Sequence, residues 1–217
     1  MRCPILLCIV LAVGASAAAD PLDINTSLAF DADAARGAAI EPEPSPAAPA
    51  VADAQPVYGK PGPWWGQIGG GYARELDDGQ AADDANLTFS FSTFLVDNFE
   101  FLTEIAGWYF TQPGDDAMGL NVSLLFRWHF LNFDTWTVFV DGGAGVLVST
   151  DLVPDTGTGF NFTPRAGVGG TIRLGESANR LVLGARWNHI SNARIKGEDR
   201  NPSRDGIMGY IAIQFPF

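Results

Sequence analysis

A histidine and a serine stand two residues apart near the C-terminus, His189 and Ser191. In a β-strand, residues i and i+2 point to the same face, so the imidazole and the hydroxyl would lie side by side. An imidazole that accepts the hydroxyl proton activates serine as a nucleophile for acyl transfer. The spacing alone is a weak signal, because two polar residues at a strand end can also simply meet water. The surroundings of the pair on its strand distinguish between these interpretations.

The segment around the pair predicts a strand with two unlike faces. The face of His189 and Ser191 is otherwise apolar, with Leu181, Leu183, Ala185 and Trp187. Arg186 and Asn188 fall on the other face. An apolar outer face indicates contact with lipid, where a polar side chain loses hydration unless it finds a partner. A paired histidine and serine would satisfy each other there, and the substrate would be a lipid of the outer leaflet, namely lipid A.

The same alternation continues through the C-terminal part of the chain. It predicts eight strands, at about 64–74, 86–96, 99–110, 119–130, 135–148, 159–174, 180–191 and 207–217. Most have 10–14 residues, whereas strands of soluble proteins average about half that length. A tilted membrane-spanning strand needs about 9–11 residues. We therefore expect an all-β fold, an eight-stranded antiparallel transmembrane β-barrel of the outer membrane, over residues 64–217.

The lengths of the connections agree with such a barrel. The links near 97–98, 131–134 and 175–179 are short, and those near 75–85, 111–118, 149–158 and 192–206 are longer. Outer-membrane barrels have short periplasmic turns and longer outer loops. With a periplasmic N-terminus, the strand at 180–191 ends at the outer leaflet, which is where we expect the His189–Ser191 pair.

The polar face of the predicted strands carries charges of both signs. The acids are Glu100, Glu104 and Asp141, and the bases are Arg127, Arg165, Arg173 and Arg186. Buried charges need partners, and the lumen of a small barrel can pair them. Such a filled lumen disfavours a small pore, and His129 is expected to be structural. Aromatic girdles are predicted from Trp64, Trp65, Trp108, Tyr109, Trp128, Trp136 and Trp187.

The N-terminal part of the sequence predicts a signal peptide followed by a disordered arm. Residues 1–19 have the basic, apolar and small-residue regions of a signal peptide. Both cysteines, Cys3 and Cys8, lie in it, so no Cys-based metal site is expected in the mature chain. Residues 20–63 are rich in Ala, Pro and acids and predict a disordered periplasmic arm. The formal net charge of −12 argues against nucleic acid as a partner.

Residues 186–207 resemble the C-terminal motif of the PagL-type lipid A 3-O-deacylases, also called the acyloxyacyl hydrolase family. The resemblance lies in His189-Ile-Ser191-Asn192-Ala193, a loop with Asn201-Pro202, and Gly206 before the last strand. It implies an eight-stranded barrel that removes an ester-linked acyl chain from lipid A in the outer membrane. Ser191 would be the nucleophile, His189 the general base, and Asn192 and Asn201 the surroundings of an oxyanion hole. No metal or organic cofactor is implied, and a homodimer is left open.

The chain departs from the family motif at two positions. Arg194 stands where the family usually has glycine, and Met208 stands where it has the glutamate that orients the histidine. Asp205 is the expected substitute, with Glu198 and Asp199 of the enlarged loop as alternatives. Without a third member, the alternative function is a non-catalytic outer-membrane barrel with a structural or surface-binding role. A carboxylate about 3 Å from the histidine nitrogen that faces away from Ser191 would discriminate between the two.

Overall fold

The structure is a computed structural model, which describes residues 55–76 and 82–217. These residues belong to one compact unit, Val51–Phe217. The expected signal peptide, and the expected arm up to residue 54, lie outside the described residues. Within the described ranges, no helix is long and apolar enough to cross a membrane.

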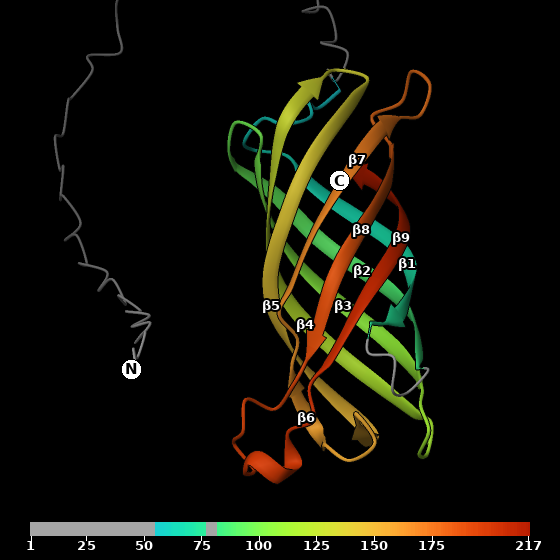
Figure 1. The fold of residues 1–217 in the computed structure, drawn as a ribbon. Helices are drawn as coiled ribbons and strands as arrows, with labels where there is room; N and C mark the ends of the chain where they lie inside the picture. The colour runs from blue at the N-terminus through green and yellow to red at the C-terminus, as the bar shows by residue number, and fades with distance from the viewer. Residues whose placement is uncertain (1–54, 77–81) are drawn as a thin grey trace, which may run out of the picture. The chain divides into compact units, whose positions relative to one another are not determined.

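Nine strands form one antiparallel sheet that closes on itself (Figure 1). They are β1 (Trp64–Glu75), β2 (Asp83–Val96), β3 (Phe99–Thr111), β4 (Ala117–Phe133), β5 (Trp136–Val153), β6 (Thr158–Phe162), β7 (Arg165–Arg173), β8 (Arg180–Ile190) and β9 (Arg204–Pro216). The sheet order is β4-β3-β2-β1-β9-β8-β7-β5-β6, and an additional β4–β5 pairing closes the ring. Because β6 and β7 both pair with β5, they share one position. The predicted eight-stranded antiparallel barrel is confirmed.

The strand expected at 159–174 is interrupted at Thr163 and Pro164. Proline has no N–H group to donate to a ladder, so it breaks regular pairing. The Pro164 carbonyl instead accepts a hydrogen bond of 3.0 Å from the His189 N–H. Beyond the break, Phe162 pairs with Ser191 as an isolated bridge. The interruption therefore lies directly beside the candidate catalytic residues.

The outer face of the barrel is apolar, as the alternation predicts. Leu120, Leu124, Trp128 and Ile211 are each more than half exposed. A continuous exposed apolar surface of this kind suits contact with lipid. Two members of the expected aromatic girdles are an exception, since Trp65 and Trp108 are buried inside the barrel. Each points inward because its strand position has the parity of the lumen.

The lumen is filled by paired charges. Arg186 reaches Glu104 at 3.1 Å and Asp141 at 2.9 Å, and Arg127 reaches Asp141 at 3.0 Å. Arg165 reaches Glu104 at 2.6 Å. This network satisfies charges that would be costly to bury singly.

Two more residues, both near turns, were expected to face the lumen. Arg173 is not part of the charge network in the lumen, because its side chain pairs with Asp134 at 3.1 Å beside a turn. His129 is buried and contacts Thr137 at 2.9 Å and Glu100 at 3.3 Å, in agreement with a structural role.

The last residues assigned to the arm by composition are part of the folded unit. Tyr58 lies buried against Trp65 and Phe94, with ring centroids 5.0 and 5.1 Å away. Its hydroxyl donates a hydrogen bond of 2.8 Å to Gln214, and Arg180 lies 4.0 Å over its ring. Burial raises the pKa of the Tyr58 hydroxyl, which keeps this donor protonated. The folded unit therefore begins before Trp64, because one aromatic side chain anchors an otherwise polar segment.

The two ends of the barrel differ in their connections. At one end, called the short-turn end, the links 97–98 and 134–135 have two residues each, and the third link is 174–179. At the other, called the long-loop end, the links 76–82, 112–116, 154–157 and 191–203 join the strands. The last of these contains the short helix η1 (Glu198–Arg200). Ser191 begins this longest link, so the candidate pair lies at the long-loop end.

Candidate active site

The register of two neighbouring strands brings the candidate residues together. β8 and β9 pair antiparallel, with His189 opposite Asp205 and Trp187 opposite Ile207. Figure 1 shows these strands side by side, with the loop and η1 between them at one end of the barrel. Asp205 is sixteen positions after His189 in the chain, yet strand pairing makes the two direct neighbours.

A chain of two hydrogen bonds runs through His189. The Ser191 hydroxyl lies 3.0 Å from Nε2, and an Asp205 carboxylate oxygen lies 3.0 Å from Nδ1. The network fits a neutral imidazole whose Nδ1–H donates to Asp205 and whose Nε2 accepts from Ser191. In this tautomer the Ser191 proton has an acceptor and the imidazole is oriented by a carboxylate. Ser191, His189 and Asp205 therefore have the hydrogen-bond geometry of a serine hydrolase triad.

A tryptophan also holds the carboxylate. The Trp187 indole N–H donates a hydrogen bond of 2.8 Å to the same Asp205 oxygen that faces His189. The Trp187 and His189 rings lie 5.7 Å apart, because the residues share one face of β8. Sequence reasoning assigned Trp187 to an aromatic girdle and missed this contact. The sequence does hold a signal for it, because Trp187 and His189 are two residues apart and therefore share one face of the strand.

Met208 does not contact His189, because its side chain points to the other side of the barrel wall. Its side chain is 1% exposed and packs inside the lumen. The side chains of Glu198 and Asp199 lie on η1, and Glu198 pairs with Arg194 at 2.9 Å. Of the carboxylates considered from the sequence, Asp205 is thus the one in contact with His189.

Asn192 and Asn201 organise the loop after the serine. The Asn192 backbone N–H donates to the Asn201 side-chain oxygen at 2.8 Å. The buried Asn192 side chain donates to Thr158 at 3.2 Å and to the Arg200 carbonyl, and accepts from the Arg194 N–H at 2.9 Å. The backbone N–H of the residue after Ser191 therefore already donates to a side-chain amide oxygen.

The backbone explains the glycine of the family motif. Ala193 and Arg194 have φ values of 51° and 63°. Glycine adopts this left-handed region without the steric cost that a Cβ carries. Arg194 therefore occupies a conformation that glycine would adopt more easily.

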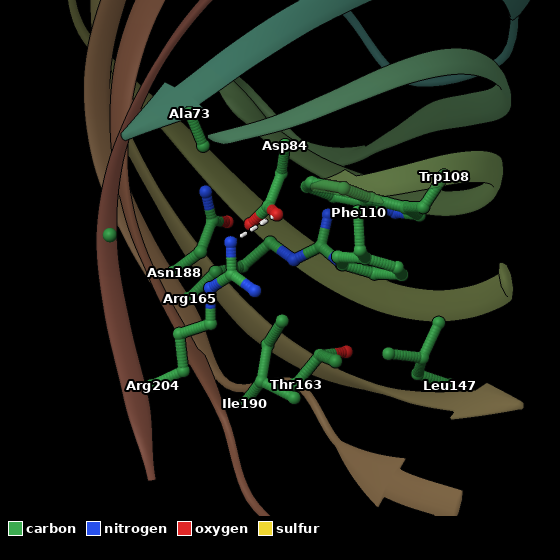
Figure 2. A pocket seen from close by; sticks show the side chains of 11 residues that line it. Ala73, Asp84, Trp108, Phe110, Leu147, Thr163, Arg165, Asn188, Ile190 and Arg204 are labelled. Atoms are coloured by element: carbon green, nitrogen blue, oxygen red, sulfur yellow. Dashed lines mark hydrogen bonds and ion pairs between the residues drawn. The ribbon is translucent and has the colours of Figure 1, made fainter. Parts of the chain in front are cut away.

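A cavity lies inside the barrel behind the triad (Figure 2). Asn188 and Ile190 of β8 and Arg204 and Gly206 of β9 line it. These positions alternate with His189 and Asp205, so the cavity and the triad lie on opposite sides of the same two strands. Among the described residues, no group of three or more His, Cys, Asp or Glu side chains is arranged to hold a metal ion.

Fold and site together define a closed eight-stranded barrel of the outer-membrane class, with a serine, a histidine and an aspartate in hydrogen-bond contact on its outer face. The sequence profile of the lipid A 3-O-deacylase (PagL) family matches residues 51–214. The chain belongs to this family.

Solved structures show the same fold. The crystal structure of the outer membrane enzyme PagL matches with a TM-score of 0.50 and 20% identity, over 70% of this chain and 99% of that chain. The crystal structure of Neisserial surface protein A matches with a TM-score of 0.55 and 14% identity, over 71% of this chain and 97% of that chain. A search of curated proteins gives no match. None of these comparisons supports a homodimer.

Proposed function

We propose that the protein is a serine esterase that hydrolyses an ester-linked acyl chain of lipid A within the outer membrane. The observation that carries the proposal is the contact of His189 with both Ser191 and Asp205, at 3.0 Å each, in a member of the lipid A 3-O-deacylase family. The site suits a substrate that resides in a membrane. It combines a polar triad with an apolar outer barrel face, where an acyl ester at the lipid–water boundary would meet the serine.

The orientation of the barrel supports this substrate. Outer-membrane barrels carry their longer loops on the outside and their short turns in the periplasm. The triad belongs to the long-loop end, so it would face the outer leaflet, where lipid A resides.

Each triad member has a defined step in the reaction. The Ser191 oxygen attacks the ester carbonyl while His189 Nε2 takes the hydroxyl proton. His189 then gives this proton to the departing sugar oxygen, and an acyl–serine ester remains. Water, deprotonated by His189, attacks that ester, and His189 returns the proton to the Ser191 oxygen as the acyl–serine bond breaks and the fatty acid leaves. Asp205 keeps Nδ1–H of the imidazole oriented and stabilises the imidazolium that forms in both steps.

The negative charge that develops on the carbonyl oxygen needs donors. The Asn192 backbone N–H is the candidate, because it belongs to the residue after the nucleophile and already donates to an amide oxygen of Asn201. An ester oxygen that displaces the Asn201 oxygen would receive the same hydrogen bond. Removing one such donor typically costs about 10²- to 10³-fold in rate.

The test is mass spectrometry of lipid A from cells that express the wild type or Ser191→Ala. We expect the wild type to remove one acyl chain and Ser191→Ala to leave lipid A intact. The serine variant should fold equally well, because its side chain is only partly buried. Intact lipid A from cells with folded, inserted wild type would instead favour the non-catalytic barrel.

A further inference from the structure

The start of β9 is paired with β8, Arg204 opposite Ile190 and Asp205 opposite His189, and two further contacts reinforce it. Asp205 is the second residue of β9, and residues 201–203 before it form no regular element. A misplacement of a catalytic group by about 1 Å can cost about 10²-fold in rate. Besides this pairing, the first support is a backbone hydrogen bond of 2.8 Å from the Leu76 N–H, directly after β1, to the Asp205 carbonyl.

The second support is the side chain of Arg204. It points into the lumen, whereas the adjacent Asp205 points outward. Its guanidinium lies 2.5 Å from an Asp84 carboxylate oxygen of β2 and 3.8 Å from a Glu75 carboxylate oxygen of β1. Figure 2 shows Arg204 and Asp84 reaching each other from different parts of the cavity wall. Since β1 lies between β2 and β9, the ion pair ties the start of β9 to a strand two positions away.

The packing beside the start of β9 is incomplete, because a cavity lies there. The cavity borders the ion pair, and the small residues Ala73 and Gly206 line it. The Asn188 side-chain amide also lines it and has no hydrogen-bond partner among the described residues. The guanidinium is buried, with 3% of its side chain exposed, so its bond to Asp84 is shielded from water and strongly directional.

We propose that Arg204 is a positioning residue for the reaction: its ion pair with Asp84 and Glu75 holds the start of β9 so that Asp205 stays in hydrogen-bond contact with His189. This inference rests on the proposed function. Arg204 acts through Asp205 and touches no substrate. Its loss is therefore expected to lower kcat and leave KM almost unchanged, because the substrate contacts remain.

The experiment compares purified, refolded variants on lipid A, with rates normalised to the folded fraction measured by heat-dependent gel migration. Arg204→Met should lower kcat by about 10- to 100-fold. Arg204→Lys keeps the charge and should recover part of the rate, although it cannot reproduce both contacts. Asp84→Asn, which keeps the shape of the partner, should act in the same direction as Arg204→Met. The matched control is Arg127→Met, which removes an equally buried, doubly paired arginine of the lumen and should retain kcat in its folded fraction.

A double-mutant cycle gives the decisive result. If Arg204 acts through Asp205, then Arg204→Met should have no further effect on the kcat of Asp205→Asn. Additive losses in the double mutant, or full kcat in folded Arg204→Met, would overturn the inference. An inactive wild type, or an active Ser191→Ala, would instead refute the proposed function, so the two failures are distinct.

Discussion

His189 and Asp205 face each other as a cross-strand pair of β8 and β9, with Nδ1 of the imidazole 3.0 Å from a carboxylate oxygen. The contact is a product of sheet register, since backbone pairing fixes both residues on the outer face. A carboxylate placed in this way does not depend on the conformation of the long loop that separates the two residues in the chain. The family position occupied by Met208 is three residues further along β9, on the lumen side, and is not required for this contact.

Asp205→Asn should lower kcat by about 10²- to 10⁴-fold, because the amide keeps the shape but cannot stabilise the imidazolium as a carboxylate does. Steady-state kinetics on lipid A would measure the loss. The control is Met208→Leu, a change of similar volume in the lumen packing, which should keep full activity. Full activity of Asp205→Asn would mean that Asp205 is not the third member.

Trp187→Phe should lower kcat by about 3- to 10-fold, because it removes the indole N–H that donates to Asp205 and keeps an aromatic ring beside His189. The same kinetic assay measures it. Trp128→Phe is the matched control, since Trp128 is another exposed tryptophan of the outer face, on β4. Equal rates for the two variants would show that the indole hydrogen bond does not contribute.

The alternation of apolar and polar residues was enough to predict most of the fold and, within the candidate site, the pair of His189 and Ser191. It predicted the faces of β4 and β8 correctly, because the two sides of a barrel wall meet different solvents. Asp205 was found from its distance to the motif, but its contact depends on register across two strands, which local pattern does not contain. The same limit hid the link from Arg204 to Asp84. Tyr58 was missed because composition averages over a window, whereas a single aromatic residue anchors the segment.

Arg194→Gly should leave the loop as stable as before or stabilise it by up to about 1 kcal/mol. The relief of a left-handed conformation at φ 63° exceeds the entropy that glycine loses on folding. The exposed ion pair with Glu198 that is lost contributes little. Arg194→Val should destabilise the loop by about 1 kcal/mol, since a β-branched side chain fits this region poorly. Limited proteolysis of the loop compares the variants, and faster cleavage of Arg194→Gly than of wild type would contradict this reasoning.

Tyr58→Ala should destabilise the barrel by about 3–5 kcal/mol, the usual cost of truncating a buried aromatic residue. Tyr58 fills the space among Trp65, Phe94 and Arg180, and its removal leaves the Arg180 guanidinium without the ring that covers it. Tyr58→Phe should cost only about 1 kcal/mol, because it removes the hydrogen bond of the hydroxyl to Gln214 and keeps the packing. Unfolding in urea, followed by heat-dependent gel migration, gives both values. The control is Val57→Ala, an adjacent side chain that is 62% exposed and should have almost no effect. If Tyr58→Ala were as stable as Val57→Ala, the segment before β1 would not contribute to the folded barrel, and the domain would begin at Trp64 as its composition suggests.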